Sequence, residues 1–276
     1  VSRRAPLVGE HTHEVVSELT TRGGGELPSV AGCEDGCAAR RVLEGVRVLD
    51  FTWVVAGPVA TRVLADHGAD VIKIERRDSL NLGSRRGGLT GNINRGKRSV
   101  VVNMNEPRGV DLVRALVRES DIVIDNFSAR VMPNWGLDYA ALKQIKPDII
   151  AISVSGFGHW GPHRDHVSYG PTIQALSGYT FAMRHPGGEP AGWGFSYSDM
   201  AAGNTTALAA LIALWHRRRS GQGQFVDVSQ LEAAVALIGP SFLDILVNAA
   251  VPQPIGNRSP ERLAAFSGPS RRLPIN

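Results

Sequence analysis

The sequence predicts an α/β protein with a doubly wound parallel sheet. Short apolar runs rich in β-branched residues recur between residues 46 and 153, and segments of helical periodicity lie between them. These runs are mostly apolar, as expected for strands that are buried on both faces of a sheet. Regular alternation of strands and helices is typical of a parallel sheet with helices covering both faces.

The predicted elements follow one another in a regular order. The predicted strands are, in chain order, residues 46–51, 71–75, 99–103, 121–124, 148–153 and 224–229. The predicted helices are residues 57–68, 110–119, 139–145, 198–219 and 230–247. Ahead of them, residues 1–22 contain one short apolar helical face, and residues 23–44 read as a linker rich in glycine and in small or charged residues.

Composition narrows the classes of function. With 276 residues, of which 43% are hydrophobic, the chain can bury a sizeable core. Its longest apolar run, residues 207–215, is too short to cross a bilayer, and the N-terminus lacks the apolar core of a signal peptide. We therefore expect a cytoplasmic protein without a membrane partner. The basic residues behind the formal charge of +4 are scattered without interleaved aromatic residues, which favours a small phosphate-bearing ligand over nucleic acid.

Two common ligand signatures are missing from the sequence. The loop after the first predicted strand lacks G-x-G-x-x-G, so an ordinary dinucleotide-binding oxidoreductase is not expected. Cys33 and Cys37 have neither the spacing of a redox pair nor two further ligands for a zinc site. We therefore expect no metal.

The segment 192–229 contains the strongest candidate for chemistry. A glycine-containing loop leads through Ser198 and Asp199 into a long helix rich in alanine and leucine, which ends in basic residues and Gly221. At a helix entrance the exposed N–H groups and the helix dipole favour a carboxylate, so we expect Asp199 to be ionised at neutral pH. This residue is either a helix cap or a nucleophile, and the two roles are compatible.

Several motifs occur together and in a fixed order. Four of them lie next to predicted strands: IERR (74–77), NRGKRS (94–99), DNFS (125–128) and SGFG (155–158). Together with the approach to Asp199, they resemble CoA-transferase family III, also called the CaiB/BaiF or formyl-CoA transferase family. The resemblance implies a Rossmann-like large domain that binds CoA.

The resemblance also implies roles for single residues. In this family the residue matching Asp199 is the carboxylate that carries the acyl group and then CoA. The matching Arg76 is expected to contact the nucleotide end of CoA, and Lys97 its phosphates, with Arg98 as a second candidate. The remaining expected contacts with CoA are Asn126, Phe127, Ser155, Gly156 and Phe157.

The function implied by the resemblance is an acyl-CoA:carboxylate CoA-transferase that works through a covalent aspartyl-CoA thioester. Coenzyme A enters as the acyl-CoA substrate, and a carboxylic acid is the acceptor. Two alternatives stay open: an acyl-CoA racemase or isomerase of the same superfamily, and a non-catalytic CoA-binding subunit. The racemases use a His near the place of Tyr169 and Gly170, which argues against racemisation. Formyl-CoA transferase has His and Gln in place of Trp53 and Val55, which argues against formyl or oxalyl substrates.

The resemblance bears on the organisation of the chain as well. Residues 1–22 are similar to the tail of a preceding copy of the fold, so the chain is expected to be a fragment of a tandem or truncated member. Residues 45–223 are then the CoA-binding large domain, and residues 224–276 begin an incomplete small domain. An interlocked homodimer or a heteromer is expected for the full-length form. For this chain we expect an unstable fragment, a non-interlocked assembly, or a fold in which residues 5–19 dock where the tail segment would lie.

Overall fold

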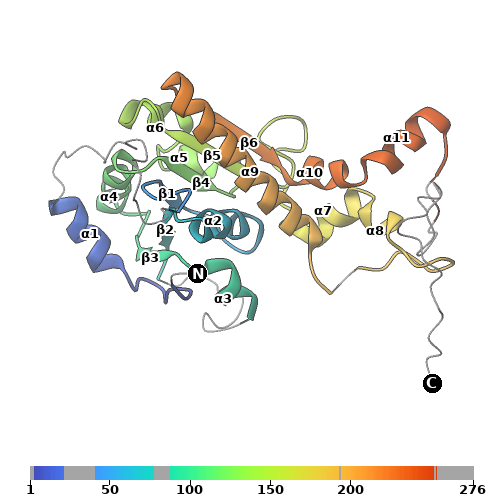
Figure 1. Ribbon diagram of the computed structural model, residues 1–276, viewed down its shortest axis with the longest axis horizontal. Coiled ribbons are helices and arrows are strands. Elements are labelled where there is room, and N and C mark those ends of the chain that lie inside the picture. Colours follow the sequence, from blue (N-terminus) through green and yellow to red (C-terminus); the bar gives the residue numbers. More distant parts are fainter. Residues whose placement is uncertain (1–2, 22–40, 78–87, 193, 252, 254–276) are drawn as a thin grey trace, which may run out of the picture.

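The fold is a six-stranded parallel sheet with helices on both faces. The computed structural model describes residues 3–21, 41–77, 88–192, 194–251 and 253 (Figure 1). The strands follow the order β3-β2-β1-β4-β5-β6, and all neighbouring strands are parallel. Their bounds are β1 (Arg47–Asp50), β2 (Asp70–Glu75), β3 (Arg98–Val101), β4 (Ile122–Asp125), β5 (Ile150–Ser155) and β6 (Phe225–Ser229). The predicted doubly wound parallel sheet is confirmed.

Helices precede, connect and follow these strands. In the described residues they are α1 (Thr12–Thr21), α2 (Ala56–Asp66), α3 (Gly88–Asn94), α4 (Pro107–Arg118), α5 (Val131–Asn134), α6 (Tyr139–Ile145), α7 (Gly170–Leu176), α8 (Tyr179–Ala182), α9 (Tyr197–Ser220), α10 (Gln230–Leu237) and α11 (Gly239–Asn248). Sequence periodicity does not reveal α3, α5, α7 and α8, because each spans at most 7 residues.

Each face of the sheet has its own hydrophobic core. Successive residues of a strand point to opposite faces. In β1, Leu49 belongs to the core that includes residues of α1, α4 and α6, whereas Val48 belongs to the core that includes residues of α2 and α9. Both side chains are fully buried. Burial on both faces explains why the strands are mostly apolar runs in the sequence.

Helix α9 lies close against α2 because small residues form its contact surface. A Cβ atom added to Gly203 would come within 2.7 Å of both the Ala56 carbonyl oxygen and Val59 Cβ. A side chain at this position would therefore force the two helices apart. The buried alanines of α9 are Ala202, Ala207, Ala210 and Ala213.

Residues 3–21 lie along β3, at the outer edge of the sheet. The His11 N–H donates to the Ser99 carbonyl oxygen over 3.0 Å, and the Val101 N–H donates to Thr12 Oγ1 over 3.1 Å. Val15 of α1 is 1% exposed and belongs to the core. The segment thus covers a strand edge whose backbone groups would otherwise be unpaired. Its similarity to the tail of a preceding copy stays a prediction.

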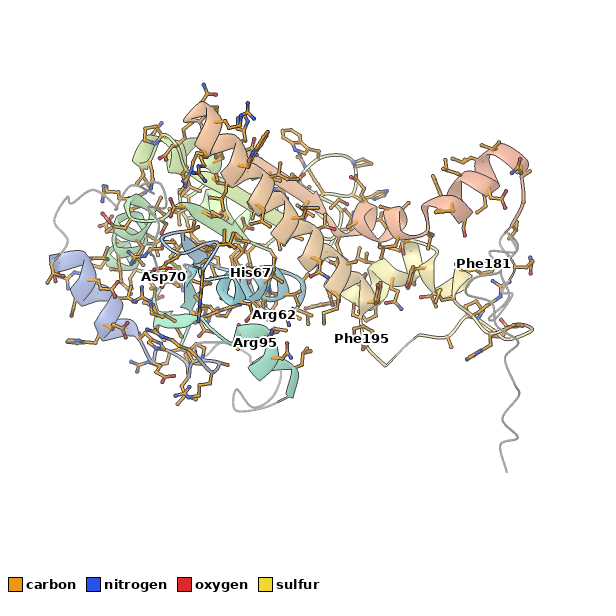
Figure 2. All side chains as sticks on the ribbon, in the orientation of Figure 1. Arg62, His67, Asp70, Arg95, Phe181 and Phe195 are labelled. Atoms are coloured by element: carbon orange, nitrogen blue, oxygen red, sulfur yellow. The ribbon has the colours of Figure 1, made fainter. Side chains whose placement is uncertain are left out.

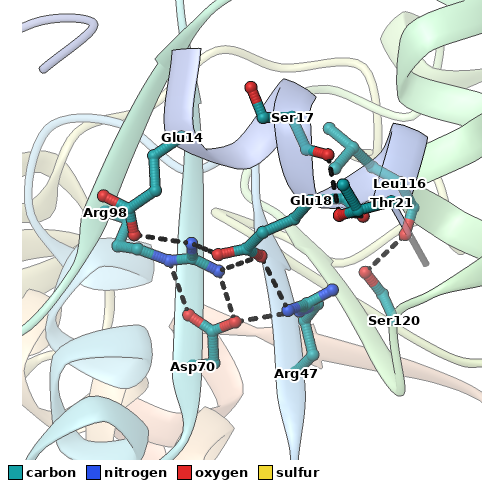
Figure 3. A network of polar contacts seen from close by, with 9 residues as sticks. All are labelled: Glu14, Ser17, Glu18, Thr21, Arg47, Asp70, Arg98, Leu116 and Ser120. Atoms are coloured by element: carbon teal, nitrogen blue, oxygen red, sulfur yellow. Dashed lines mark hydrogen bonds and ion pairs between the residues drawn. The ribbon is translucent and has the colours of Figure 1, made fainter. Parts of the chain in front are cut away.

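An ion-pair network fixes α1 to the amino ends of three strands (Figure 3). Arg98 contacts Asp70 and Glu18, with nitrogen–oxygen distances of 2.6 and 2.7 Å. Arg47 contacts the same two carboxylates at 2.9 and 3.2 Å. The two arginine side chains are almost completely buried, so these ion pairs offset the cost of removing both guanidinium groups from water.

One prediction about the C-terminal part is wrong, and another stays a prediction. Strand β6 pairs with β5, so residues 225–229 belong to the same sheet as the other strands, while the start of a small domain after residue 223 stays a prediction. The helix predicted over residues 230–247 is two helices, α10 and α11, bent by 76° at their junction. Gly239 and Pro240 occupy this junction, and proline cannot continue an uninterrupted helix.

Some predictions cannot be compared with the structure. Most of the linker, including Cys33 and Cys37, and nearly all of residues 252–276 lie outside the described residues. Within the described part of the chain, no single helix has the length and hydropathy of a membrane span. The bent pair α10 and α11 reaches both only when its two helices are taken together.

Candidate active site

A cavity of about 660 Å³ opens at the carboxyl ends of the strands. The strand order reverses between β1 and β4, and the loops that follow these two strands form part of its wall. Ligands of open α/β sheets commonly bind at this point of reversal. The remaining wall comes from the loop after β5, from α7, and from the starts of α9 and α10. Phe195, labelled in Figure 2, belongs to the loop that enters α9 and lines the cavity.

The cavity brings together five of the predicted site residues from three separate parts of the chain. These are Asn126, Phe127, Ser155, Gly156 and Asp199. The other four predicted residues do not line it: Arg76, Lys97, Arg98 and Phe157.

Asp199 lies in the first turn of α9, three residues after the helix cap Ser196. The side chain is buried, and its Oδ1 accepts a hydrogen bond of 2.7 Å from Gln230 Nε2. Burial raises the pKa of Asp199 above its ordinary value, while hydrogen bonds from Ser196 and Gln230 act in the opposite direction. Desolvation therefore outweighs these two hydrogen bonds.

Gly170, the first residue of α7, lies directly against the Asp199 carboxylate. A Cβ atom at this position would be 2.3 Å from Asp199 Oδ2 and 1.7 Å from Ser196 Oγ. Any other residue would therefore displace the carboxylate or the helix cap. Ser198 Oγ donates to the Gly170 carbonyl oxygen over 2.7 Å and fixes this close approach.

The loops after β1 and β4 are joined by Asn126. Its Nδ2 donates to the Trp53 carbonyl oxygen, and its Oδ1 accepts from the Trp53 N–H, both over 2.9 Å. Val54 follows Trp53 in the loop after β1. Its φ of 63° is unfavourable for a β-branched residue. Phe127 packs edge-on against Trp135 at 5.6 Å between ring centroids. Asn126 thus holds a strained loop in place at the cavity wall.

The loop after β5 is anchored beneath the cavity. Ser153 Oγ lies 2.9 Å from His159 Nε2, and the His159 N–H donates to Asp227 Oδ2 over 2.8 Å. A Cβ atom on Gly156 would lie 1.8 Å from Ser168 Oγ, so the glycine lets two parts of this loop meet. Phe157 does not line the cavity itself, but its ring packs on those of His163 and His166, and His166 belongs to the lining.

Lys97 lies away from the cavity lining, among internal partners. This side chain is fully buried, and its Nζ lies 3.0 Å from Asp50 Oδ2 and 3.2 Å from the Pro58 carbonyl oxygen. Burial lowers the pKa of Lys97 to about 7, although the attraction of Asp50 opposes this shift. The ammonium group is an internal partner of Asp50, and its contact with a CoA phosphate stays a prediction.

Arg98 lies at the end of the sheet opposite the cavity, and its contact with CoA stays a prediction. It begins β3, and its guanidinium binds Asp70 and Glu18 at the amino ends of the strands, opposite the cavity. A short basic motif does not reveal this, because the neighbouring carboxylates come from distant parts of the chain. Arg76 follows the carboxyl end of β2 and is exposed, and its contact with CoA stays a prediction.

Sequence reasoning missed Gln230. The residue directly follows β6 and begins α10, so it lies where ligands of a parallel sheet gather. That position was the available signal, but the contact itself joins residues 31 positions apart.

The family model of CoA-transferase family III matches residues 43–268. The succinate–glutarate CoA-transferase of Agrobacterium fabrum is 36% identical over 235 residues, which are 79% of this chain and 58% of that protein. The succinyl-CoA–D-citramalate CoA-transferase of Chloroflexus aurantiacus is 36% identical over 228 residues, which are 80% and 57% of the two chains. This chain thus spans less than three fifths of the length of these curated relatives.

Solved structures agree with this match. A CaiB/BaiF family protein from Brucella suis superposes with a TM-score of 0.74 and 33% identity, covering 80% of this chain and 62% of that one. Rv3272 from Mycobacterium tuberculosis superposes with a TM-score of 0.68 and 34% identity, covering 75% and 60%. The chain belongs to CoA-transferase family III.

Proposed function

We propose that this protein moves CoA from an acyl-CoA donor to a carboxylic acid acceptor, with Asp199 as the covalent carrier. The observation that supports this most is the position of Asp199 itself. Its carboxylate lies in the wall of a cavity at the carboxyl ends of the strands, where an amide group holds one of its oxygens. Family membership supports the transfer of CoA, and the cavity supplies a place for it.

In the proposed mechanism, one Asp199 oxygen attacks the thioester carbonyl of the donor and expels CoA thiolate, which leaves a mixed anhydride. The thiolate attacks Asp199 Cγ, so the donor acid leaves and an aspartyl-CoA thioester remains. The acceptor carboxylate attacks this thioester and releases the thiolate with formation of a second anhydride. The thiolate then attacks the acceptor carbonyl, which yields the new acyl-CoA and free Asp199. Each attacking group is already an anion, so the sequence needs no general base.

Each tetrahedral intermediate in this sequence needs hydrogen-bond donors for its oxyanion. We propose the backbone N–H groups of residues 192–194, in the loop that enters α9, as these donors. Gly194 lines the cavity, which supports its part in this role, whereas Trp193 lies outside the described residues.

We infer dicarboxylic acids as the class of donor and acceptor. The two relatives described above are named for succinate, glutarate and citramalate, which each carry two carboxylates. The cavity lining includes Arg164, whose side chain forms a 3.6 Å ion pair with Asp165 that is more than half exposed. Such exposed pairs are weak. A second substrate carboxylate can therefore replace Asp165 as the partner of Arg164.

Racemisation is a second candidate because the imidazole of His166 lines the cavity. Removal of an α-proton requires a base within reach of the substrate. Gly170 lies near the place where racemases carry their His, and it has no side chain that could act as this base. Incorporation of solvent deuterium at the α-carbon of an acyl-CoA would reveal racemisation, and we expect CoA transfer without such exchange.

We also propose that the protein works as a homodimer. Helix α11 projects from the body of the molecule and has no buried residue (Figure 1). Its apolar side chains Leu243 and Leu246 are 59% and 66% exposed. Contiguous exposed apolar surface of this kind marks an interaction site, and a second copy of the chain is the partner that we propose.

The transfer reaction can be tested with succinyl-CoA as donor and glutarate as acceptor. We expect formation of glutaryl-CoA, detected by mass spectrometry. The variant Asp199→Asn removes the nucleophilic oxygen, so transfer should fall by at least about 10³-fold.

The control for this variant is its thermal midpoint. Burial disfavours the charged form of Asp199, and the Asp199→Asn variant replaces it with a neutral amide. The midpoint of thermal unfolding at neutral pH should therefore stay unchanged or rise. Full transfer activity in Asp199→Asn and Asp199→Ala would overturn the proposed mechanism.

A further inference from the structure

The two oxygens of the Asp199 carboxylate have different surroundings. Oδ1 accepts the hydrogen bond from Gln230 Nε2 over 2.7 Å. Oδ2 lies beside the α-carbon of Gly170, where a Cβ atom would be only 2.3 Å away. Only a glycine lets the backbone at position 170 come this close to Oδ2, and Gly170, Asp199 and Gln230 all line the cavity.

We propose that Gln230 assigns the two oxygens separate chemical roles. Oδ1 stays on Asp199 as its carbonyl oxygen through every turnover, and Oδ2 is the nucleophilic oxygen that leaves with the product. This inference rests on the proposed function, since it specifies which atoms take part in the covalent transfer.

Gln230 is held firmly enough to make this distinction. Its side chain is 6% exposed. It is the first residue of α10, and the preceding Ser229 caps this helix by accepting a hydrogen bond from the Glu232 N–H. Ser229 ends β6, which pairs with β5 along its whole length. The amide is therefore presented from the rigid end of the sheet.

The hydrogen bond to Oδ1 gains strength when Asp199 Cγ becomes tetrahedral. When the CoA thiolate attacks Cγ of the first anhydride, the C–S bond forms and the electron pair of the carbonyl moves onto Oδ1. The intermediate collapses with loss of the donor carboxylate, which takes Oδ2 with it. An N–H donor aimed at Oδ1 stabilises the charge at this moment. Gln230 is thus both a positioning residue and an oxyanion donor.

The oxygen balance then follows from the second half of the reaction. The acceptor carboxylate attacks the aspartyl-CoA thioester through one of its own oxygens, which becomes the bridging oxygen of the second anhydride. The thiolate attacks the acceptor carbonyl, and the bridging oxygen stays on Asp199 as the new Oδ2. One oxygen therefore passes from acceptor to enzyme, and one from enzyme to product, in each turnover.

The experiment follows ¹⁸O through repeated turnovers. The protein is incubated with succinyl-CoA and with glutarate labelled with ¹⁸O in all carboxylate oxygens, and the peptide that contains Asp199 is analysed by mass spectrometry. We expect one ¹⁸O atom in Asp199 after the first turnover and no second atom after many. Two ¹⁸O atoms in the wild-type protein would overturn the inference while leaving the covalent mechanism intact. The absence of any label would overturn both.

A pair of variants separates this role from a general effect on folding. In Gln230→Leu the two oxygens lose their distinction, so a second ¹⁸O atom should accumulate and transfer should slow by about 10²- to 10³-fold. Gln174→Leu is the matched control, because Gln174 is equally buried but accepts from the Tyr197 N–H. It should keep the single label. A single label in both variants would show that Gln230 does not distinguish the oxygens.

Discussion

Burial and hydrogen bonding shift the pKa of the Asp199 carboxyl in opposite directions. Burial raises its pKa, so folding favours the protonated carboxyl. The contribution of this group to the free energy of unfolding therefore falls as the pH rises through its folded pKa. The proposed chemistry needs the anion, and the hydrogen bonds from Ser196 and Gln230 favour that form.

This balance predicts the pH dependence of acylation. The rate of adduct formation with acyl-CoA should fall as Asp199 takes up a proton, at a higher pH than an exposed aspartate would require. Gln230→Leu removes a donor to the anion, so the acidic limb of the profile should move to still higher pH. Rates measured from acidic to neutral pH check this. An unmoved limb would show that Gln230 does not influence the ionisation of Asp199.

The sequence predicts where single site residues lie better than it predicts which residues contact them. Asp199 could be predicted from its place at a helix start, and Asn126 and Ser155 from the family resemblance of their motifs; the structure places all three on one cavity. The surroundings of Lys97 could not be predicted, since its partner Asp50 lies 47 positions away. Gln230 was missed for the same reason.

Among the elements, β1, β2 and α2 are joined by a buried ion cluster below the cavity. Asp50 contacts Lys97 at 3.0 Å and Lys73 at 3.9 Å. Burial alone would raise the pKa of Asp50, but the two lysines and nearby hydroxyls lower it to about 2. Lys73 also donates to the Thr52 carbonyl oxygen, next to the strained loop at Val54. The cluster therefore supports the cavity wall.

This arrangement gives Lys97 a structural role that a variant can test. Lys97→Met breaks a buried ion pair, which should lower the free energy of unfolding by about 3 kcal/mol. Arg95→Met is the control, because Arg95 forms a more exposed pair with Asp66 and its loss should cost less than about 1 kcal/mol (Figure 2). Thermal and urea denaturation measure both. A normal stability with a raised KM for acyl-CoA would instead support the CoA contact predicted from the sequence.

The strands were the easiest elements to predict, and each observed strand overlaps its predicted run. Continuous burial on both faces produces long apolar runs that leave little ambiguity. The break between α10 and α11 was harder, because Ile238 and its neighbours keep an apolar pattern across Gly239 and Pro240. Apolar periodicity alone does not distinguish one long helix from two bent ones.

In the whole molecule, the first and the last described segments differ in how much of their surface is covered by the rest of the chain. Residues 3–21 are bound to the sheet edge through backbone hydrogen bonds and buried ion pairs. Helix α11, by contrast, presents apolar side chains on a projecting helix (Figure 1). The sequence predicts both segments, but only the structure shows which one is already covered.

The proposed homodimer predicts the mass of the protein in solution. Light scattering should give twice the mass of one chain, and the double variant Leu243→Glu with Leu246→Glu should give a monomer. Val42→Glu is the control, since Val42 is 85% exposed and lies in the segment that enters β1. A monomeric wild-type protein would contradict the proposed assembly.

The most direct measurement is the capture of the covalent intermediate. The protein is incubated with succinyl-CoA, treated with borohydride, which reduces an aspartyl thioester to the alcohol, and digested for mass spectrometry of its peptides. The account predicts reduction at Asp199, dependent on acyl-CoA and lost in Asp199→Asn. Transfer of CoA with an unmodified Asp199, or with the adduct on another residue, would contradict it.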